Sequence, residues 1–268
     1  MKFGLDVATS GEWGDIRLLT ELAVEAESAG WDGFFVWDVL LTDDDIPVAE
    51  PWVTLTAIAS ATHRIRIGAM VTPLVRKQSW DVAKQAAAID QLSDGRLTFG
   101  AGLGSGDAEF QRLGLPIDLR ERAALMEQSL AEMDTIWRGG SASGGDLRQM
   151  PLPVQRPRVP VWLAAGWPRK RPLRRAALWD GVYLMTNNQE TDERLRPDEV
   201  AEAVAFLRDA RGSLDGFDVA ANVETLNDAD EGKSANVNMA EAGATWTLEL
   251  TPDTLDDHRR LIRRGPAR

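Results

Sequence analysis

Eight short runs of apolar and β-branched residues alternate with longer segments of helical periodicity along this chain. We predict strands at residues 3–8, 33–37, 65–72, 97–102, 161–165, 181–185, 218–223 and 245–250. Strands that alternate with helices build parallel sheets from βαβ units. Eight such repeats in 268 residues predict one (β/α)8 TIM barrel domain spanning residues 1–268. A doubly wound sheet is the competing fold, but Gly4 and Gly11 do not form its glycine fingerprint.

The composition excludes several classes of function. The chain has no cysteine, so disulfide frameworks, thiolate metal sites and thiol nucleophiles are absent. His63 and His258 are too few for most zinc hydrolases, and no metal site is predicted. We expect His258 at the surface or in an interface, because it lies in an arginine-rich final helix. The net charge of −12 argues against a nucleic-acid partner.

Nothing in the sequence indicates a membrane protein. The N-terminal residues 1–7 are too short and too soon acidic for a signal peptide. No apolar run approaches the ~20 residues of a membrane-spanning helix. We therefore expect a cytoplasmic protein.

Glycines stand at alternate positions where the fourth predicted strand ends. In a barrel of this kind the chemistry lies at the C-terminal ends of the strands. Glycine lets backbone N–H groups approach a ligand oxygen, so Gly100, Gly102, Gly104 and Gly106 are candidates for phosphate contacts. Tight packing of this strand end against a neighbouring strand is the alternative interpretation.

A second pattern is an uneven distribution of charge. Residues 147–179 contain no Asp or Glu but eight Arg and Lys residues. Pro168 begins a predicted helix directly behind Gly166, and a helix N-terminus behind a glycine favours an anion. We expect the Ala165 and Gly166 backbone to make the phosphate contact, whereas most of the arginines pair with acids on an outer helix face.

Four tryptophans lie near predicted strand ends: Trp37, Trp52, Trp167 and Trp246. Together they predict an aromatic wall for a planar ligand. Each one alone is better explained by core packing.

At these positions the sequence resembles the bacterial luciferase-like superfamily of flavin- and deazaflavin-dependent oxidoreductases. The matching segments are residues 67–74, 83–104, 109–110, 113–114, 160–168, 179–181 and 242–246. The resemblance implies a barrel that binds FMN or the deazaflavin coenzyme F420 at its C-terminal mouth. It also implies a bulge in the third strand, with a cis peptide between non-proline residues around Ala69 to Val71.

The resemblance further implies which positions contact the cofactor. These are Asp38, Ala69, Met70, Val71, Thr72, Gly102, Leu103, Gly104, Ser105, Ala165, Gly166 and Trp167. Thr72 matches the position that contacts the ring or its side chain. The segments at residues 103–105 and 165–166 match phosphate and ribityl contacts.

Two positions depart from the family pattern. Val39 stands where members commonly carry a histidine, and Ser105 stands where deazaflavin members often carry a glutamate. Valine cannot transfer a proton. We therefore predict Asp38 and Glu12 as catalytic residues, with Glu249 as a further carboxylate that could serve.

The predicted function is a flavin- or deazaflavin-dependent oxidoreductase that acts on a small organic substrate. With FMN it would be a monooxygenase supplied by a separate flavin reductase, and with F420 it would transfer hydride. The alternative is a flavin-binding protein with little or no turnover, which Val39 motivates. The resemblance also implies a homodimer.

Overall fold

Nine parallel strands of the described residues form one nearly closed barrel in the computed structural model. The structure describes the chain except residues 43–45, 105–106, 141–149, 187–193 and 226–228. The strands are β1 (Lys2–Val7), β2 (Gly33–Val36), β3 (Arg66–Ala69), β4 (Thr72–Pro73), β5 (Phe99–Gly102), β6 (Val161–Trp167), β7 (Gly181–Thr186), β8 (Asp218–Val223) and β9 (Trp246–Leu250). Their order is β3-β2-β1-β9-β8-β7-β6-β5-β4. The predicted TIM barrel is confirmed.

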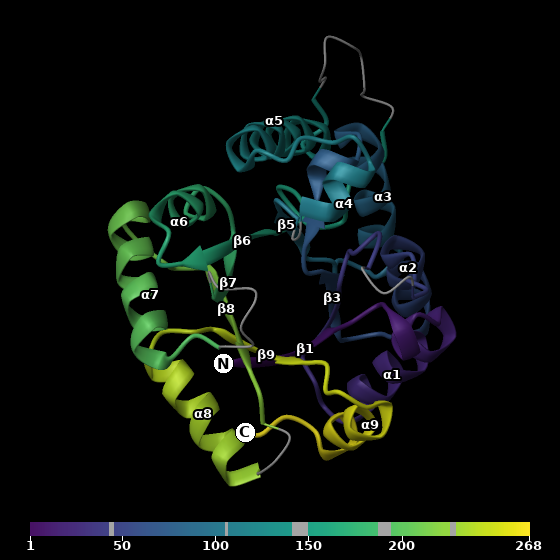
Figure 1. The fold of residues 1–268 in the computed structure, drawn as a ribbon, viewed down its shortest axis with the longest axis vertical. Helices are drawn as coiled ribbons and strands as arrows, with labels where there is room; N and C mark the ends of the chain where they lie inside the picture. Colours follow the sequence, from purple (N-terminus) through teal and green to yellow (C-terminus); the bar gives the residue numbers. More distant parts are fainter. Residues whose placement is uncertain (43–45, 105–106, 141–149, 187–193, 226–228) are drawn as a thin grey trace.

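The helices form a ring outside the barrel (Figure 1). They are α1 (Ile16–Ser28), α2 (Pro51–Ala61), α3 (Ser79–Leu92), α4 (Asp107–Arg112), α5 (Leu119–Trp137), α6 (Lys170–Ala176), α7 (Pro197–Arg211), α8 (Ala229–Glu241) and α9 (Leu255–Arg264), with the 3-10 turns η1 (Gly11–Trp13) and η2 (Leu74–Arg76). Side chains cap several of them. The Glu50 carboxylate accepts from the Val53 amide at the start of α2, and Asp118 caps α5. Among the described residues, no helix is long and apolar enough to cross a membrane.

The third predicted strand is not continuous. β3 pairs with β2, and β4 pairs with β5. Between them the Met70–Val71 peptide is cis, as the family resemblance implies. The prediction of one strand over residues 65–72 is therefore wrong. Because β3 and β4 lie at the two ends of the strand order, the barrel closes through this interruption, helped by an isolated bridge between Ile67 and Leu97.

Alternating residues of the strands fill the inside of the barrel. This inner core consists of Phe35, Met70, Trp162, Tyr183, Ala220, Trp246 and Leu248, with half-buried Val71, Ala164 and Met185 against it. The prediction that Trp246 lies near the mouth is wrong, because it begins β9 at the opposite end. There its Nε1 donates to Asp218 Oδ1 at 3.1 Å, and its ring packs 5.4 Å from that of Trp162.

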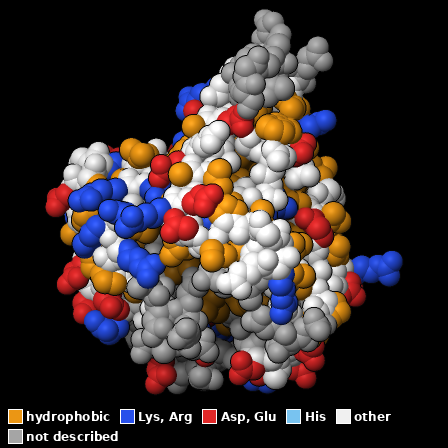
Figure 2. Space-filling view, turned by 45° about the horizontal axis from the view of Figure 1, so that its top comes forward, with side chains coloured by type: hydrophobic (Ala, Val, Ile, Leu, Met, Phe, Trp, Pro, Cys, Tyr) orange, Lys and Arg blue, Asp and Glu red, His pale blue; other side chains and the backbone are white. Residues whose placement is uncertain are grey.

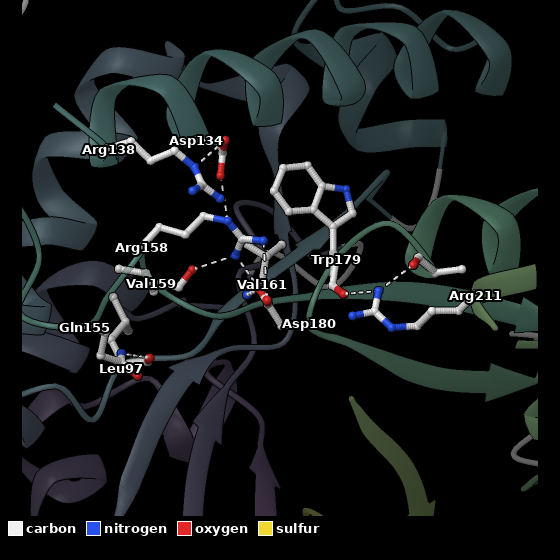
Figure 3. Close-up of polar contacts among 11 residues, drawn as sticks. Leu97, Asp134, Arg138, Gln155, Arg158, Val159, Val161, Trp179, Asp180 and Arg211 are labelled. Carbon is white, nitrogen blue, oxygen red and sulfur yellow. Dashed lines mark hydrogen bonds and ion pairs between the residues drawn. The ribbon is translucent and has the colours of Figure 1, made fainter. Parts of the chain in front are cut away.

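Arg158 ties the N-terminal ends of β6 and β7 together (Figure 3). Its guanidinium pairs with Asp180 and places Nε 2.6 Å from Asp134 Oδ1. Asp180 Oδ2 also accepts from the Val161 amide at 2.7 Å. Arg175 likewise pairs with Glu127. Two of the eight basic residues of segment 147–179 thus pair with acids, Arg158 just before β6 and Arg175 on the outer helix α6.

His258 is buried, so its predicted surface position is wrong. Its Nδ1 accepts from the Trp13 Nε1–H at 2.9 Å. Burial, assisted by the positive charge of Arg259, lowers the pKa of His258 to about 4. The misplacement has a simple cause. The four arginines of α9 dominate its composition, but His258, Leu261 and Ile262 share its buried face.

Candidate functional site at the barrel mouth

The C-terminal ends of the strands place the predicted residues around one mouth. Three half-buried side chains cover the inner core: Val71 from the turn between β3 and β4, Ala164 from β6 and Met185 from β7. Gly166 is also half-buried, whereas Ala165 and Trp167 are buried. Except for Val71, which lies in the turn between β3 and β4, these positions lie on strands, which makes their backbones rigid.

Asp38 is held in a buried ion cluster just after β2. Arg76 donates to its Oδ1, the Trp52 Nε1–H donates to its Oδ2 at 3.3 Å, and Arg76 also reaches Glu109 Oε1 at 2.7 Å. The three charged side chains are nearly excluded from solvent. Both carboxylate oxygens of Asp38 therefore have partners within the protein, and the cluster joins the loops after β2 and β4 to α4.

The other two predicted carboxylates lie apart from the inner core. Glu12 is exposed in η1. Glu249 is buried and accepts from the Thr225 amide at 3.0 Å and from the Thr225 hydroxyl, beside Arg264. Burial raises the pKa of Glu249, although the Thr225 hydrogen bonds lower it. Since Leu248 points into the barrel, the next residue along β9, Glu249, points away from it.

The alternating glycines make room for the interrupted third strand. A Cβ on Gly100 would lie 2.1 Å from the Ala69 carbonyl oxygen, and one on Gly102 would lie 2.2 Å from Val71 Cγ2. Gly104 has a φ of +81° and packs against Phe110. The tight-packing interpretation accounts for these three positions. Leu103 is half-buried, and Ser105 and Gly106 lie outside the described residues.

Basic side chains gather along α6, which begins beside the mouth. Arg169, Lys170, Arg171 and Arg174 are exposed, and Figure 2 shows Lys and Arg side chains on the side of the molecule where α6 lies in Figure 1. Lys170 Nζ is 3.7 Å from the centroid of the Trp167 ring. This contact covers Trp167 with a positive charge.

A polar cluster that sequence reasoning missed lies inside the barrel, directly beneath the mouth. The Tyr183 hydroxyl donates to Asp6 Oδ2 at 2.5 Å, and Asn222 Nδ2 donates to the Tyr183 oxygen at 2.7 Å. Burial raises the pKa of Asp6 to about 7, against the opposing effect of the Tyr183 and Trp37 side chains. Burial, and then the charge of Asp6, raises the pKa of Tyr183 well above its usual value.

One signal in the sequence pointed to this cluster. Asp6 is a single acid within an apolar strand, and a buried acid without a cationic partner marks a functional position. Its partners could not be found in this way, because Tyr183 is 177 residues away and reads as an ordinary core aromatic.

Three buried polar atoms around the mouth have no hydrogen-bond partner among the described residues. They are Asp6 Oδ1, Thr72 Oγ1 and Asn222 Oδ1. Buried polar atoms are normally paired, so unpaired ones indicate a missing ligand or water. These three polar atoms, together with the apolar side chains of Val71 and Met185, fit a flat heteroaromatic ring that has polar atoms at its edge.

Fold and site together define a (β/α)8 barrel with buried polar groups near its C-terminal mouth. The family described as luciferase-like monooxygenase matches residues 2–246. The chain therefore belongs to the luciferase-like monooxygenase family, whose relatives include F420- and FMN-dependent enzymes.

Two relatives illustrate the sequence similarity. An uncharacterized protein of Mycobacterium tuberculosis is 30% identical over 244 residues, which are 86% of this chain and 80% of that protein. An F420-dependent glucose-6-phosphate dehydrogenase of Beutenbergia cavernae is 38% identical over 129 residues, which are 46% of this chain and only 38% of that enzyme.

Two solved structures illustrate the similarity of fold. The coenzyme F420-dependent tetrahydromethanopterin reductase of Methanopyrus kandleri has a TM-score of 0.78 at 16% identity, covering 98% of this chain and 96% of that one. The oxygenating constituent of 3,6-diketocamphane monooxygenase from Pseudomonas putida, in complex with FMN, has a TM-score of 0.67 at 17% identity, covering 87% and 70%. At these identities the similarity concerns the fold alone.

Proposed function

We propose that this protein is an oxidoreductase that binds FMN or coenzyme F420 at the C-terminal mouth and acts there on a small organic substrate. The observation that carries the proposal is the break that separates β3 from β4, together with the three buried polar atoms that have no partner among the described residues. Relatives named as F420-dependent and a neighbouring fold that contains FMN support the choice of cofactor class. When bound, such a ring exchanges hydride or, once reduced, reacts with oxygen.

Each part of the mouth would have its own role in holding the ring. The segment from Ala69 to Thr72 would lie against the ring, with Thr72 Oγ1 free to bond it. The backbones at 102–104 and at 165–167 would hold the ribityl and phosphate groups, and the second of these segments directly precedes the basic start of α6. Asp38 would hold the loop after β2 in place through Arg76.

Two further expectations belong to this proposal. A homodimer follows from the resemblance, and a separate flavin reductase would be needed only if the ring is FMN and the reaction is a monooxygenation. The alternative, a flavin-binding protein with little turnover, is favoured by Val39, which is half-buried where a proton-transferring side chain would stand.

A fluorescence titration tests the proposal directly. Purified protein is titrated separately with FMN and with F420, and quenching of tryptophan emission reports binding, since Trp37 and Trp167 lie near the mouth. Binding of FMN alone would direct the work to oxygen consumption, and binding of F420 alone to hydride transfer. Binding of neither ring would overturn the proposed function. A bound ring that is reduced but turns over no substrate would favour the alternative.

A further inference from the structure

The single tyrosine of the chain lies inside the barrel, in contact with a fully buried acid. Tyr183 comes from β7, Asp6 from β1 and Asn222 from β8. The hydroxyl of Tyr183 bridges the other two, at 2.5 Å from Asp6 Oδ2 and 2.7 Å from Asn222 Nδ2. None of the three was predicted as a catalytic residue from the sequence.

The hydrogen bonds fix where a proton on Asp6 would lie. Asn222 donates to the Tyr183 oxygen, so Tyr183 directs its own proton to Asp6 Oδ2. With the Tyr183 proton directed to Oδ2, the place left for a proton on Asp6 is Oδ1, a buried atom with no hydrogen-bond partner at standard distance within the described parts of the chain, although the Trp37 side chain is close enough to lower the pKa of this carboxyl. Asp6 thus offers an O–H donor, and Asn222 Oδ1 offers an acceptor, to whatever binds above them.

We propose that Asp6 and Tyr183, positioned by Asn222, form the proton-transfer pair of this site, with a small carbonyl or imine compound as the substrate reduced there. This inference rests on the proposed function, because the reductant is the reduced flavin or deazaflavin ring. It supplies the proton donor that Val39 cannot provide.

The proton and electron balance is simple. The bound reduced ring would supply a hydride to the substrate C=O or C=N carbon and would itself be oxidised, while the C=O or C=N π electrons move to the oxygen or nitrogen. That oxygen or nitrogen takes the proton of Asp6 Oδ1, which leaves Asp6 as a carboxylate hydrogen-bonded to Tyr183. Water then returns one proton to Asp6. In the reverse direction the Asp6 carboxylate accepts the proton of an alcohol or amine.

The surroundings of Asp6 suit this role better than those of the other carboxylates. Asp6 is held by the Tyr183 phenol and hydrogen-bonded by the Trp37 side chain, while Asp38 has the Arg76 guanidinium on one oxygen and the Trp52 indole on the other. The groups that act on the pair are Trp37, next to Asp6, and Arg194, whose charge lowers the pKa of Tyr183 while burial raises it. With its pKa near 7, Asp6 can both give and take a proton at neutral pH.

Whether Asp6 holds a proton near neutral pH is tested on the protein without any cofactor. Protein labelled with 13Cζ-tyrosine has one tyrosine resonance, because Tyr183 is the only tyrosine. We expect this resonance to titrate with a midpoint near 7, to lose that titration in Asp6→Asn and to keep it in Glu12→Gln, which changes an exposed acid. A resonance that does not change between pH 5 and 9 in the unsubstituted protein would overturn the pair.

Its use in catalysis is tested on the loaded protein. The reduced form of the ring that binds is mixed with a panel of small ketones and aldehydes, and oxidation of the ring is followed across pH. We expect Asp6→Asn to reduce kcat by about a hundredfold or more while ring affinity is unchanged. Tyr183→Phe should raise the pH midpoint of kcat, because the lost hydrogen bond lowers the pKa of Asp6.

The outcomes separate this inference from the proposed function. Full activity in Asp6→Asn, or a bound ring with no turnover of any panel member by the unsubstituted protein, would overturn the inference and leave the ring-binding site intact. Failure of both rings to bind, with the Tyr183 titration preserved, would overturn the proposed function and leave the buried proton pair. Circular dichroism confirms that each variant is folded.

Discussion

Two buried aspartates near the mouth differ in what surrounds them. Asp38 faces Arg76, and Asp6 faces the Tyr183 hydroxyl. The Arg76 guanidinium and the Trp52 indole occupy both oxygens of Asp38, whereas burial in the barrel beside a phenol raises the pKa of Asp6. We therefore assign positioning of the loop after β2 to Asp38 and proton transfer to Asp6.

Asp38→Asn should destabilise the protein by about 3 kcal/mol, because among the described residues it leaves the buried Arg76 with Glu109 alone as a charged partner. Urea denaturation measures the free energy of unfolding. Glu12→Gln is the matched control and should change it by less than about 0.5 kcal/mol, since Glu12 is exposed. If Asp38→Asn is as stable as the unsubstituted chain, the ion cluster does not hold this loop.

For single residues, the sequence predicts which positions lie at the mouth better than it predicts which side chains they contact. Asp38, Thr72, Gly102 and Gly166 could be named because they lie at or just beyond strand ends or match family segments. Asp6 stands out as a single acid in an apolar strand, but its contact with Tyr183 could not be predicted, because side chains inside a barrel meet across strands that are distant in the sequence. For the same reason His258, surrounded by arginines along the chain, was wrongly placed at the surface.

Among the elements, the junction of β3, β4 and β5 determines the shape of the mouth. The Val71 side chain fills the space beside Gly102. A Cβ added to Gly102 would lie only 2.2 Å from Val71 Cγ2. Val71 can therefore keep its position only because residue 102 is a glycine.

Gly102→Ala should weaken ring binding by about tenfold or more, because the new methyl displaces Val71 from the mouth. The double variant Val71→Ala/Gly102→Ala should recover part of the affinity, since it removes the clashing Cγ2 atom. Val71→Ala alone is the control. Fluorescence titration with the ring that binds gives the three affinities. Equal affinities for Gly102→Ala and the double variant would show that Val71 does not transmit the effect.

At the opposite end of the barrel, Arg158 fixes the starts of β6 and β7 without touching the mouth. Arg158→Met should lower the free energy of unfolding by about 2 kcal/mol and leave ring affinity unchanged. Arg138→Met is the matched control, since Arg138 pairs with the same Asp134 at 2.8 Å from an exposed position, and it should cost less than about 0.5 kcal/mol. A loss of ring affinity in Arg158→Met would show that the two ends of the barrel are coupled.

Periodicity predicted the order of the elements but not their interruptions. The eight predicted strands correspond to β1 through β9 because apolar runs between helices are strong signals. The break at Met70–Val71 follows no local pattern and came only from the family resemblance. Helix α4 was missed, since six residues are too few to show a helical period.

For the whole molecule, two buried groups give stability opposite dependences on pH. Folded Asp6 keeps its proton up to about pH 7, whereas its unfolded counterpart loses it near 3.8. Between these values the folded state holds the extra proton, so raising the pH destabilises it. Folded His258 binds a proton only below about 4, whereas the unfolded residue binds one below 6.5. Raising the pH across that interval stabilises the folded state.

These two effects should nearly cancel between pH 4.5 and 6, and single substitutions should reveal each one. In Asp6→Asn the free energy of unfolding should rise relative to the unsubstituted protein by about 1 kcal/mol per pH unit, because the opposing His258 effect remains. In His258→Asn, whose amide oxygen can still accept from Trp13, it should fall by a similar amount per unit. Urea denaturation at four pH values gives the slopes. Parallel profiles for all three proteins would mean that neither group carries a shifted pKa, and the proton held on Asp6 would lose its thermodynamic basis.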